Sequence, residues 1–176
     1  MDALLIVDFQ NDFTPGGALA VDGGDEIAGP LDRLLDRFEL VVATRDWHPP
    51  DHASFAGIWP VHCVEGTPGA ELHPGLDRAK VDVVIDKGRD RDSEGYSAFD
   101  GTDLAERLRS RGVTRLYVAG LATDYCVKHS VLDALREGFD VVVLEDAIRG
   151  VDVEPGDSAR AIAEMKDAGA MITRSV

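Results

Sequence analysis

Short apolar runs rich in β-branched residues recur along the chain, separated by segments in which apolar residues return every three or four positions. Most of these runs are continuous rather than alternating, which is typical of parallel strands covered on both faces. The pattern therefore predicts strands at Ala3–Asp8, Leu40–Thr44, Val81–Asp86, Arg115–Ala119, Asp140–Leu144 and Ala170–Thr173.

The segments between the runs predict helices. Leu31, Leu34, Leu35 and Phe38 form one apolar stripe, and Pro30 suits a first helical position. Three further helices are expected after Thr102, after Cys126 and from Asp157 or Ser158, and they end at Gly112, Gly138 and Gly169. Strands that alternate with helices predict a doubly wound α/β sheet.

Length and charge narrow the class of protein. The 176 residues show no break in composition, so one domain over 1–176 is expected. The net charge of −15 argues against nucleic acid or an anionic membrane as the main partner, because both need clustered Lys and Arg. The N-terminal residues lack the basic stretch and the long apolar run of a secretory signal peptide. A cytoplasmic protein in which Cys63 and Cys126 are reduced is therefore expected.

Polar residues stand where the predicted strands end. Asp8 ends the first strand, Asp46 follows the second, Lys87 follows the third, and the fourth leads through a tight turn to Cys126. Ligands of an open parallel sheet bind beyond the carboxyl ends of its strands. The four side chains are therefore expected to converge at one edge.

Three of them form a plausible nucleophile set. Cys126 follows the turn in the first turn of a predicted helix, where the helix N-terminus favours a thiolate. Asp8 can act as general base, and the charge of Lys87 favours both anions. Backbone N–H groups of Ala122 and Cys126 can hold an oxyanion. The alternatives are a cysteine that is only a buried apolar residue, or one paired with His129.

The long connection after the second strand predicts a metal site. Asp46 and His48 project to the same side of an extended segment, and His62 follows in the same loop. One carboxylate and two imidazoles suit zinc first, with iron or manganese as alternatives. His52 is a further candidate ligand, whereas Cys63 is expected to be buried, and a purely structural role for the Asp-x-His pair stays open.

Phe13, Trp59 and Tyr96 lie in three loops near the same strand ends. They either close the core or line a flat apolar pocket for a ring-shaped substrate. Sequence motifs for nucleotide cofactors are absent, since there is no Walker lysine motif and no G-x-G-x-x-G.

Taken in order, these motifs resemble the nicotinamidase/pyrazinamidase branch of the isochorismatase-like cysteine hydrolases. The resemblance covers essentially the whole chain. Its segments are Ile6–Phe13, Gly16–Leu19, Thr44–Pro49, Trp59–Val64, Gly66–Ala70, Asp86–Gly88, Tyr96–Phe99 and Gly120–Val127.

The resemblance implies a three-layer α/β/α sandwich with a six-stranded parallel sheet, isochorismatase-like and Rossmann-like. It also implies a cis peptide bond before Ala122, and a substrate ring that lies among Phe13, Trp59 and Tyr96. The implied catalytic triad is Asp8, Lys87 and Cys126, and the implied ligands of a divalent metal are Asp46, His48 and His62.

The implied activity is hydrolysis of nicotinamide to nicotinate and ammonia in NAD salvage, through a thioester on Cys126, with pyrazinamide as an alternative substrate. Rival readings are an amidase for another small amide such as a carbamoyl compound, an isochorismate-cleaving enzyme, a binding domain without activity, and a redox sensor built on Cys126. Metal identity and an assembly into homo-oligomers stay open.

Overall fold

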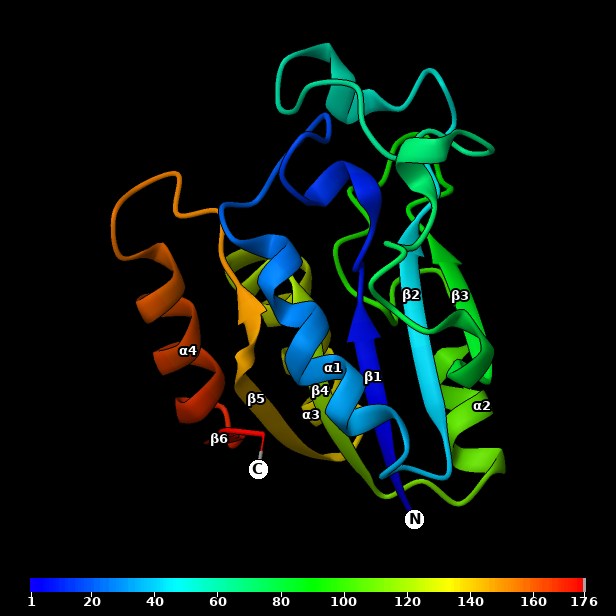
Figure 1. The fold of residues 1–176 in the computed structure, drawn as a ribbon, viewed down its shortest axis with the longest axis vertical. Coiled ribbons are helices and arrows are strands. Elements are labelled where there is room, and N and C mark those ends of the chain that lie inside the picture. Colours follow the sequence, from blue (N-terminus) through cyan, green and yellow to red (C-terminus); the bar gives the residue numbers. More distant parts are fainter. Residues whose placement is uncertain (176) are drawn as a thin grey trace.

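The computed structural model describes residues 1–175 and contains one six-stranded, fully parallel sheet with the strand order β3-β2-β1-β4-β5-β6 (Figure 1). The predicted α/β fold class is therefore confirmed. The strands are β1 (Asp2–Val7), β2 (Val41–Asp46), β3 (Val83–Lys87), β4 (Arg115–Leu121), β5 (Asp140–Arg149) and β6 (Met171–Thr173).

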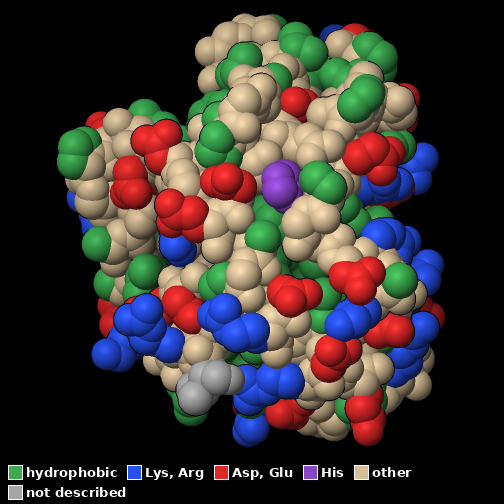
Figure 2. Space-filling view, viewed as in Figure 1, with side chains coloured by type: hydrophobic (Ala, Val, Ile, Leu, Met, Phe, Trp, Pro, Cys, Tyr) green, Lys and Arg blue, Asp and Glu red, His purple; other side chains and the backbone are tan. Residues whose placement is uncertain are grey.

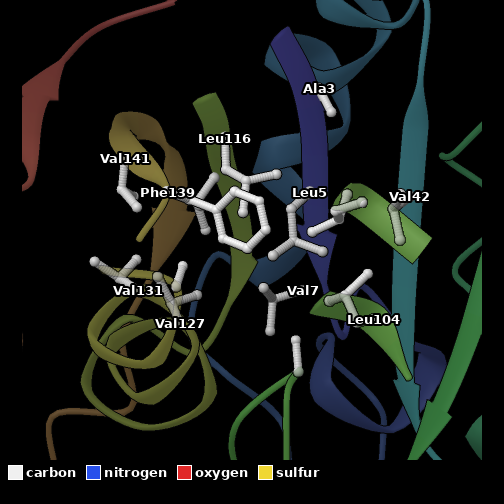
Figure 3. Close-up of a cluster of buried hydrophobic side chains, with 14 of the residues drawn as sticks. Ala3, Leu5, Val7, Val42, Leu104, Leu116, Val127, Val131, Phe139 and Val141 are labelled. Atoms are coloured by element: carbon white, nitrogen blue, oxygen red, sulfur yellow. The ribbon is translucent and has the colours of Figure 1, made fainter. Parts of the chain in front are cut away.

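Helices cover both faces of the sheet and complete three layers. On one face, Leu4 and Ile6 of β1 pack with the apolar stripe of α1. On the other face, Leu5 and Val7 pack with α2 and α3, as Figure 3 shows for part of this core. The helices are α1 (Ala28–Leu35), α2 (Leu104–Ser110), α3 (Lys128–Arg136) and α4 (Asp157–Asp167).

Several boundaries differ from the prediction. Strand β5 continues to Arg149, five residues beyond the predicted end, because its register with β4 shifts after Val118 and the added residues pair with Gly120 and Leu121. Helix α1 begins at Ala28, so Pro30 is its third residue, because a 3₁₀ turn leads directly into the helix. The missing N–H of Pro30 still falls within the first turn, where no intrahelical acceptor exists.

Gly120 of β4 pairs with Val7 of β1. Its φ is +121°, and a Cβ at this position would lie 2.0 Å from the carbonyl oxygen of Val7. Only glycine allows both this backbone conformation and this approach. The contact fixes the distance between the two strands whose carboxyl ends carry Asp8 and Cys126.

Gly120→Ala is therefore expected to destabilise the protein by at least about 3 kcal/mol, because a methyl group must displace the backbone of β1. Urea unfolding monitored by circular dichroism measures the loss. Gly57→Ala is the matched control: Gly57 has a φ of +128°, but its Cβ would meet no atom within 4 Å. An equal loss in both variants would show that backbone conformation, and not the β1–β4 contact, sets the cost.

Within residues 1–175, no helix is long and apolar enough to cross a membrane. Acidic and basic side chains are interspersed on the face of the molecule seen in Figure 2. The cytoplasmic location and the homo-oligomer stay predictions.

Candidate active site

The sheet reverses its winding direction between β1 and β4, and this is the point where open α/β sheets bind ligands. Asp8 directly follows β1, and Cys126 lies in the turn after β4. Asp46 and Lys87 are the last residues of β2 and β3. The structure brings all four together as buried side chains at one edge of the sheet, as the sequence predicts.

The ammonium group of Lys87 is the centre of this cluster. Its Nζ lies 2.8 Å from Asp8 Oδ2 and 2.6 Å from Asp46 Oδ1, and it donates to the carbonyl oxygen of Gly95 at 2.9 Å. It also lies 3.5 Å from Cys126 Sγ. Although burial disfavours the charge, the two carboxylates raise the pKa of Lys87 well above its usual range. Lys87 is therefore a permanent cation between two acids.

Asp8 is held in one orientation by β2. Its backbone is left-handed, with a φ of 48°, which is uncommon for a residue other than glycine. The hydroxyl group of Thr44 donates to Asp8 Oδ1 at 2.7 Å and accepts from the Asp8 N–H at 3.2 Å. Burial raises the pKa of Asp8 to about 6, although the charge of Lys87 opposes the shift. A carboxyl group with this pKa can accept and return a proton near neutral pH.

Cys126 differs from the prediction in its local structure. It lies in a π-helical turn, Thr123–Val127, and the α-helix begins only at Lys128. Burial raises the pKa of the Cys126 thiol well above its usual range, although Lys87 opposes the shift. Burial therefore opposes the thiolate that Lys87 and the start of the helix favour, and this is consistent with Asp8 as the predicted base.

The peptide bond between Leu121 and Ala122 is cis, as the resemblance implies. Ala122 and Cys126 both lie in the wall of the pocket described below. His129, the alternative partner of the cysteine, instead stacks on Tyr96, with 5.2 Å between ring centroids and 18° between planes. Within residues 1–175, no hydrogen bond joins His129 to Cys126.

Asp46, His48 and His62 form a buried group whose ligand atoms all lie within 4.8 Å of one another. The Nδ1 atoms of the two histidines lie 2.7 Å from the carbonyl oxygens of Gly88 and Pro60. These contacts assign the proton to Nδ1 and leave each Nε2 as a donor to a metal. Burial lowers the pKa of His62, which keeps it neutral. The residues therefore fit a divalent metal.

His52 lies outside this ligand group. Its Nε2 is 2.8 Å from the carbonyl oxygen of Ser93, and its Nδ1 contacts the hydroxyl and N–H of Ser54 at 2.7 and 3.3 Å. Because both ring nitrogens take part in these contacts, His52 offers no free nitrogen to a metal. Its ring packs against the ring of His48. Cys63 is buried, as predicted, and lies outside the ligand group as well.

A pocket with a largely apolar wall opens onto Cys126. Trp59 donates its Nε1–H to the hydroxyl oxygen of Tyr96 at 3.1 Å, and the Tyr125 ring meets Trp59 edge-on at 5.0 Å. Tyr125 was missed in the sequence, although its place beside Cys126 was a usable signal. The lining residues are Phe13, Leu19, Asp46, Trp59, His62, Tyr96, Ala122, Tyr125, Cys126 and Val151.

The isochorismatase domain family matches residues 2–175, and the chain therefore belongs to that family. Its relatives include the nicotinamidase of Escherichia coli, 44% identical over 97% of this chain and 93% of the relative. The nicotinamidase/pyrazinamidase of Mycobacterium tuberculosis is 42% identical over 96% of both chains. The predicted branch of the family is thereby confirmed.

Solved structures that are similar to this chain include members of the same branch of the family. The crystal structure of a pyrazinamidase of Pyrococcus horikoshii in complex with zinc has a TM-score of 0.90 and 47% identity, and the match covers 98% of both chains. PnC1 from L. infantum in complex with nicotinate has a TM-score of 0.94 and 40% identity, and covers 99% of this chain and 93% of that chain.

Proposed function

We propose that the protein is a nicotinamidase, a metal-dependent cysteine amidohydrolase that converts nicotinamide to nicotinate and ammonia and also accepts pyrazinamide. The observation that carries the proposal is that Cys126, two metal-ligand side chains and the four aromatic rings of Phe13, Trp59, Tyr96 and Tyr125 line one pocket. The names of the relatives support the same reaction.

In the first half of the reaction, Asp8 removes the proton of the Cys126 thiol as the sulfur attacks the carboxamide carbon. The new S–C bond gives a tetrahedral intermediate, whose oxyanion is held by the backbone N–H groups of Ala122 and Cys126. Asp8 then gives its proton to the nitrogen, the C–N bond breaks, and ammonia leaves a thioester. The charge of Lys87 favours the ionised form of Asp8 before the first transfer and after the second.

In the second half, Asp8 takes a proton from water, whose oxygen attacks the thioester carbon. The C–S bond breaks, and the proton on Asp8 returns to the sulfur of Cys126. The carboxylic acid product loses its remaining proton to solvent and leaves as nicotinate. The same carboxyl group therefore acts as base and acid in both halves, as its pKa of about 6 allows.

Zinc is the metal that best fits Asp46, His48 and His62, because one carboxylate and two imidazoles match its preferred ligands. When bound, the ion supplies a Lewis-acid position for the ring nitrogen of the substrate. Asp46 and His62 also line the pocket, so the ligand group faces the space where the ring is expected to lie.

The substrate is tested by ammonia release from a panel of amides with the zinc-replete protein. Nicotinamide and pyrazinamide are expected to exceed benzamide, which lacks the ring nitrogen, by at least about 100-fold in kcat/KM. N-carbamoylsarcosine, the substrate in the name of a more distant relative, represents the rival carbamoyl amidase. A preference for that compound, or no ammonia from any amide, would overturn the proposal.

Removal of the metal is expected to abolish activity. After dialysis against a chelator, ammonia release should disappear and return on addition of zinc, iron or manganese, but not of magnesium, which prefers oxygen ligands. Asp46→Ala should behave as the metal-free protein does and should not recover with zinc. Full activity of the chelated protein would contradict a role for the metal in turnover.

A further inference from the structure

Two side chains of the short segment after β1, those of Gln10 and Asp12, contact the backbone at the proposed metal ligands. Gln10 contacts the backbone of Asp46, and Asp12 contacts the backbone next to His62. Gln10 is fully buried, and its side chain pairs with both backbone groups of Asp46. Its Oε1 accepts from the Asp46 N–H at 2.8 Å, and its Nε2 donates to the Asp46 carbonyl oxygen at 2.9 Å. The remaining Nε2 hydrogen goes to the carbonyl oxygen of Ala70 at 2.7 Å. Both N–H groups of the Gln10 amide therefore donate to backbone carbonyl oxygens.

Asp12 makes the corresponding contact to the second ligand segment. Its Oδ2 accepts from the N–H of Cys63 at 2.7 Å, and its Oδ1 accepts from the N–H of Ala18 at 3.2 Å. Cys63 follows His62 directly and has a φ of 46°, a left-handed backbone that a residue with a side chain adopts at a cost. The carboxylate of Asp12 stabilises the turn that aims His62 at the ligand group.

Backbone contacts join the two ends of this arrangement. The N–H of His48 donates to the carbonyl oxygen of Cys63 at 2.9 Å. The turn that Asp12 stabilises therefore also helps to position the backbone of His48. Gly69 packs against Asp12 so closely that a Cβ there would lie 2.3 Å from Oδ2. The carboxylate therefore has no room to adopt another position on that side.

We infer that Gln10 and Asp12 are positioning residues of the metal site, which set the spacing of Asp46, His48 and His62 and thereby the affinity for zinc. Neither side chain belongs to the ligand group. This inference rests on the metal site of the proposed function. Outer partners of metal ligands contribute about 10- to 100-fold to metal affinity, because they hold the ligands in the bound arrangement.

The test measures the zinc dissociation constant of each variant by competition with a chromophoric chelator. Gln10→Met keeps the length of the side chain but removes its three hydrogen bonds, and should weaken zinc binding by about 10- to 100-fold. Asp12→Asn can offer an oxygen to only one of its two N–H partners, and should weaken binding by about 10-fold. At saturating zinc, kcat should return close to the wild-type value, because the ligands themselves are present.

Asn11→Ala is the matched control. The amide group of Asn11 donates to the carbonyl oxygen of Pro68 at 2.8 Å, so this variant loses a similar bond to the same neighbouring loop. It touches neither Asp46 nor Cys63, and its zinc affinity should stay within about twofold of wild type. Urea unfolding of each metal-free variant separates a general loss of stability from a specific loss of zinc affinity.

The outcomes are distinct. Wild-type zinc affinity in folded Gln10→Met and Asp12→Asn would overturn the inference and leave the proposed function intact. An equal loss of affinity in Asn11→Ala would overturn it as well. If wild type and Asp46→Ala bind zinc equally, the proposed metal site itself fails. If Gln10→Met does not fold, Asp12→Asn decides the question alone, since Asp12 is only partly buried.

Discussion

Lys87→Met is expected to destabilise the metal-free protein by about 3–5 kcal/mol, because it leaves two buried carboxylates without their shared cation. Asp8 and Asp46 both lie within 2.8 Å of the ammonium group, and both are buried. Urea unfolding of the metal-free protein measures the effect. A further Asp8→Asn substitution should recover part of the loss, because it removes one of the two unpaired charges.

Lys80→Met is the matched control for this prediction. Lys80 also forms a close ion pair, 2.8 Å from Asp36, but it lies at the surface, where water solvates both groups. Exposed pairs contribute little to stability, so this variant should unfold nearly as wild type does. A similar loss in both lysine variants would contradict the view that burial makes Lys87 indispensable.

Cys126→Ala is expected to lower ammonia release from nicotinamide by at least about 10⁴-fold, because Cys126 supplies the sulfur of the proposed thioester. The aromatic wall and the metal ligands remain, so binding of nicotinamide should persist. Isothermal titration calorimetry on the zinc-replete variant measures this binding, and a coupled ammonia assay measures turnover.

Cys63→Ala is the control for the loss of a buried thiol. Cys63 is as buried as Cys126 but lies outside the pocket lining. Its variant should keep most of its turnover, even if it loses some stability through the cavity that it creates. Loss of turnover in both variants, with nicotinamide still bound, would leave the nucleophile unassigned.

The sheet and the position of the site could be predicted because both follow from short-range patterns. Continuous apolar runs mark parallel strands, and the carboxyl ends of parallel strands share one edge, so Asp8, Asp46 and Lys87 had to meet. The extension of β5 to Arg149 could not be predicted, since it depends on a register shift against β4.

The depth at which Cys126 is buried could not be predicted either. The sequence shows a helix start and a lysine, which both favour a thiolate, but not how deeply the sulfur is buried. The contacts of Gln10 and Asp12 escaped prediction for a similar reason. They depend on loops from distant parts of the chain that meet only in the folded protein.

Hydrolysis through a thioester on Cys126 is tested most directly by mass spectrometry of the zinc-replete protein, quenched in acid during turnover of nicotinamide. We predict that the peptide containing Cys126 carries a nicotinoyl group and that Cys126→Ala carries none and releases no ammonia. A nicotinoyl group on a different residue, or ammonia release by Cys126→Ala at the wild-type rate, would contradict the mechanism.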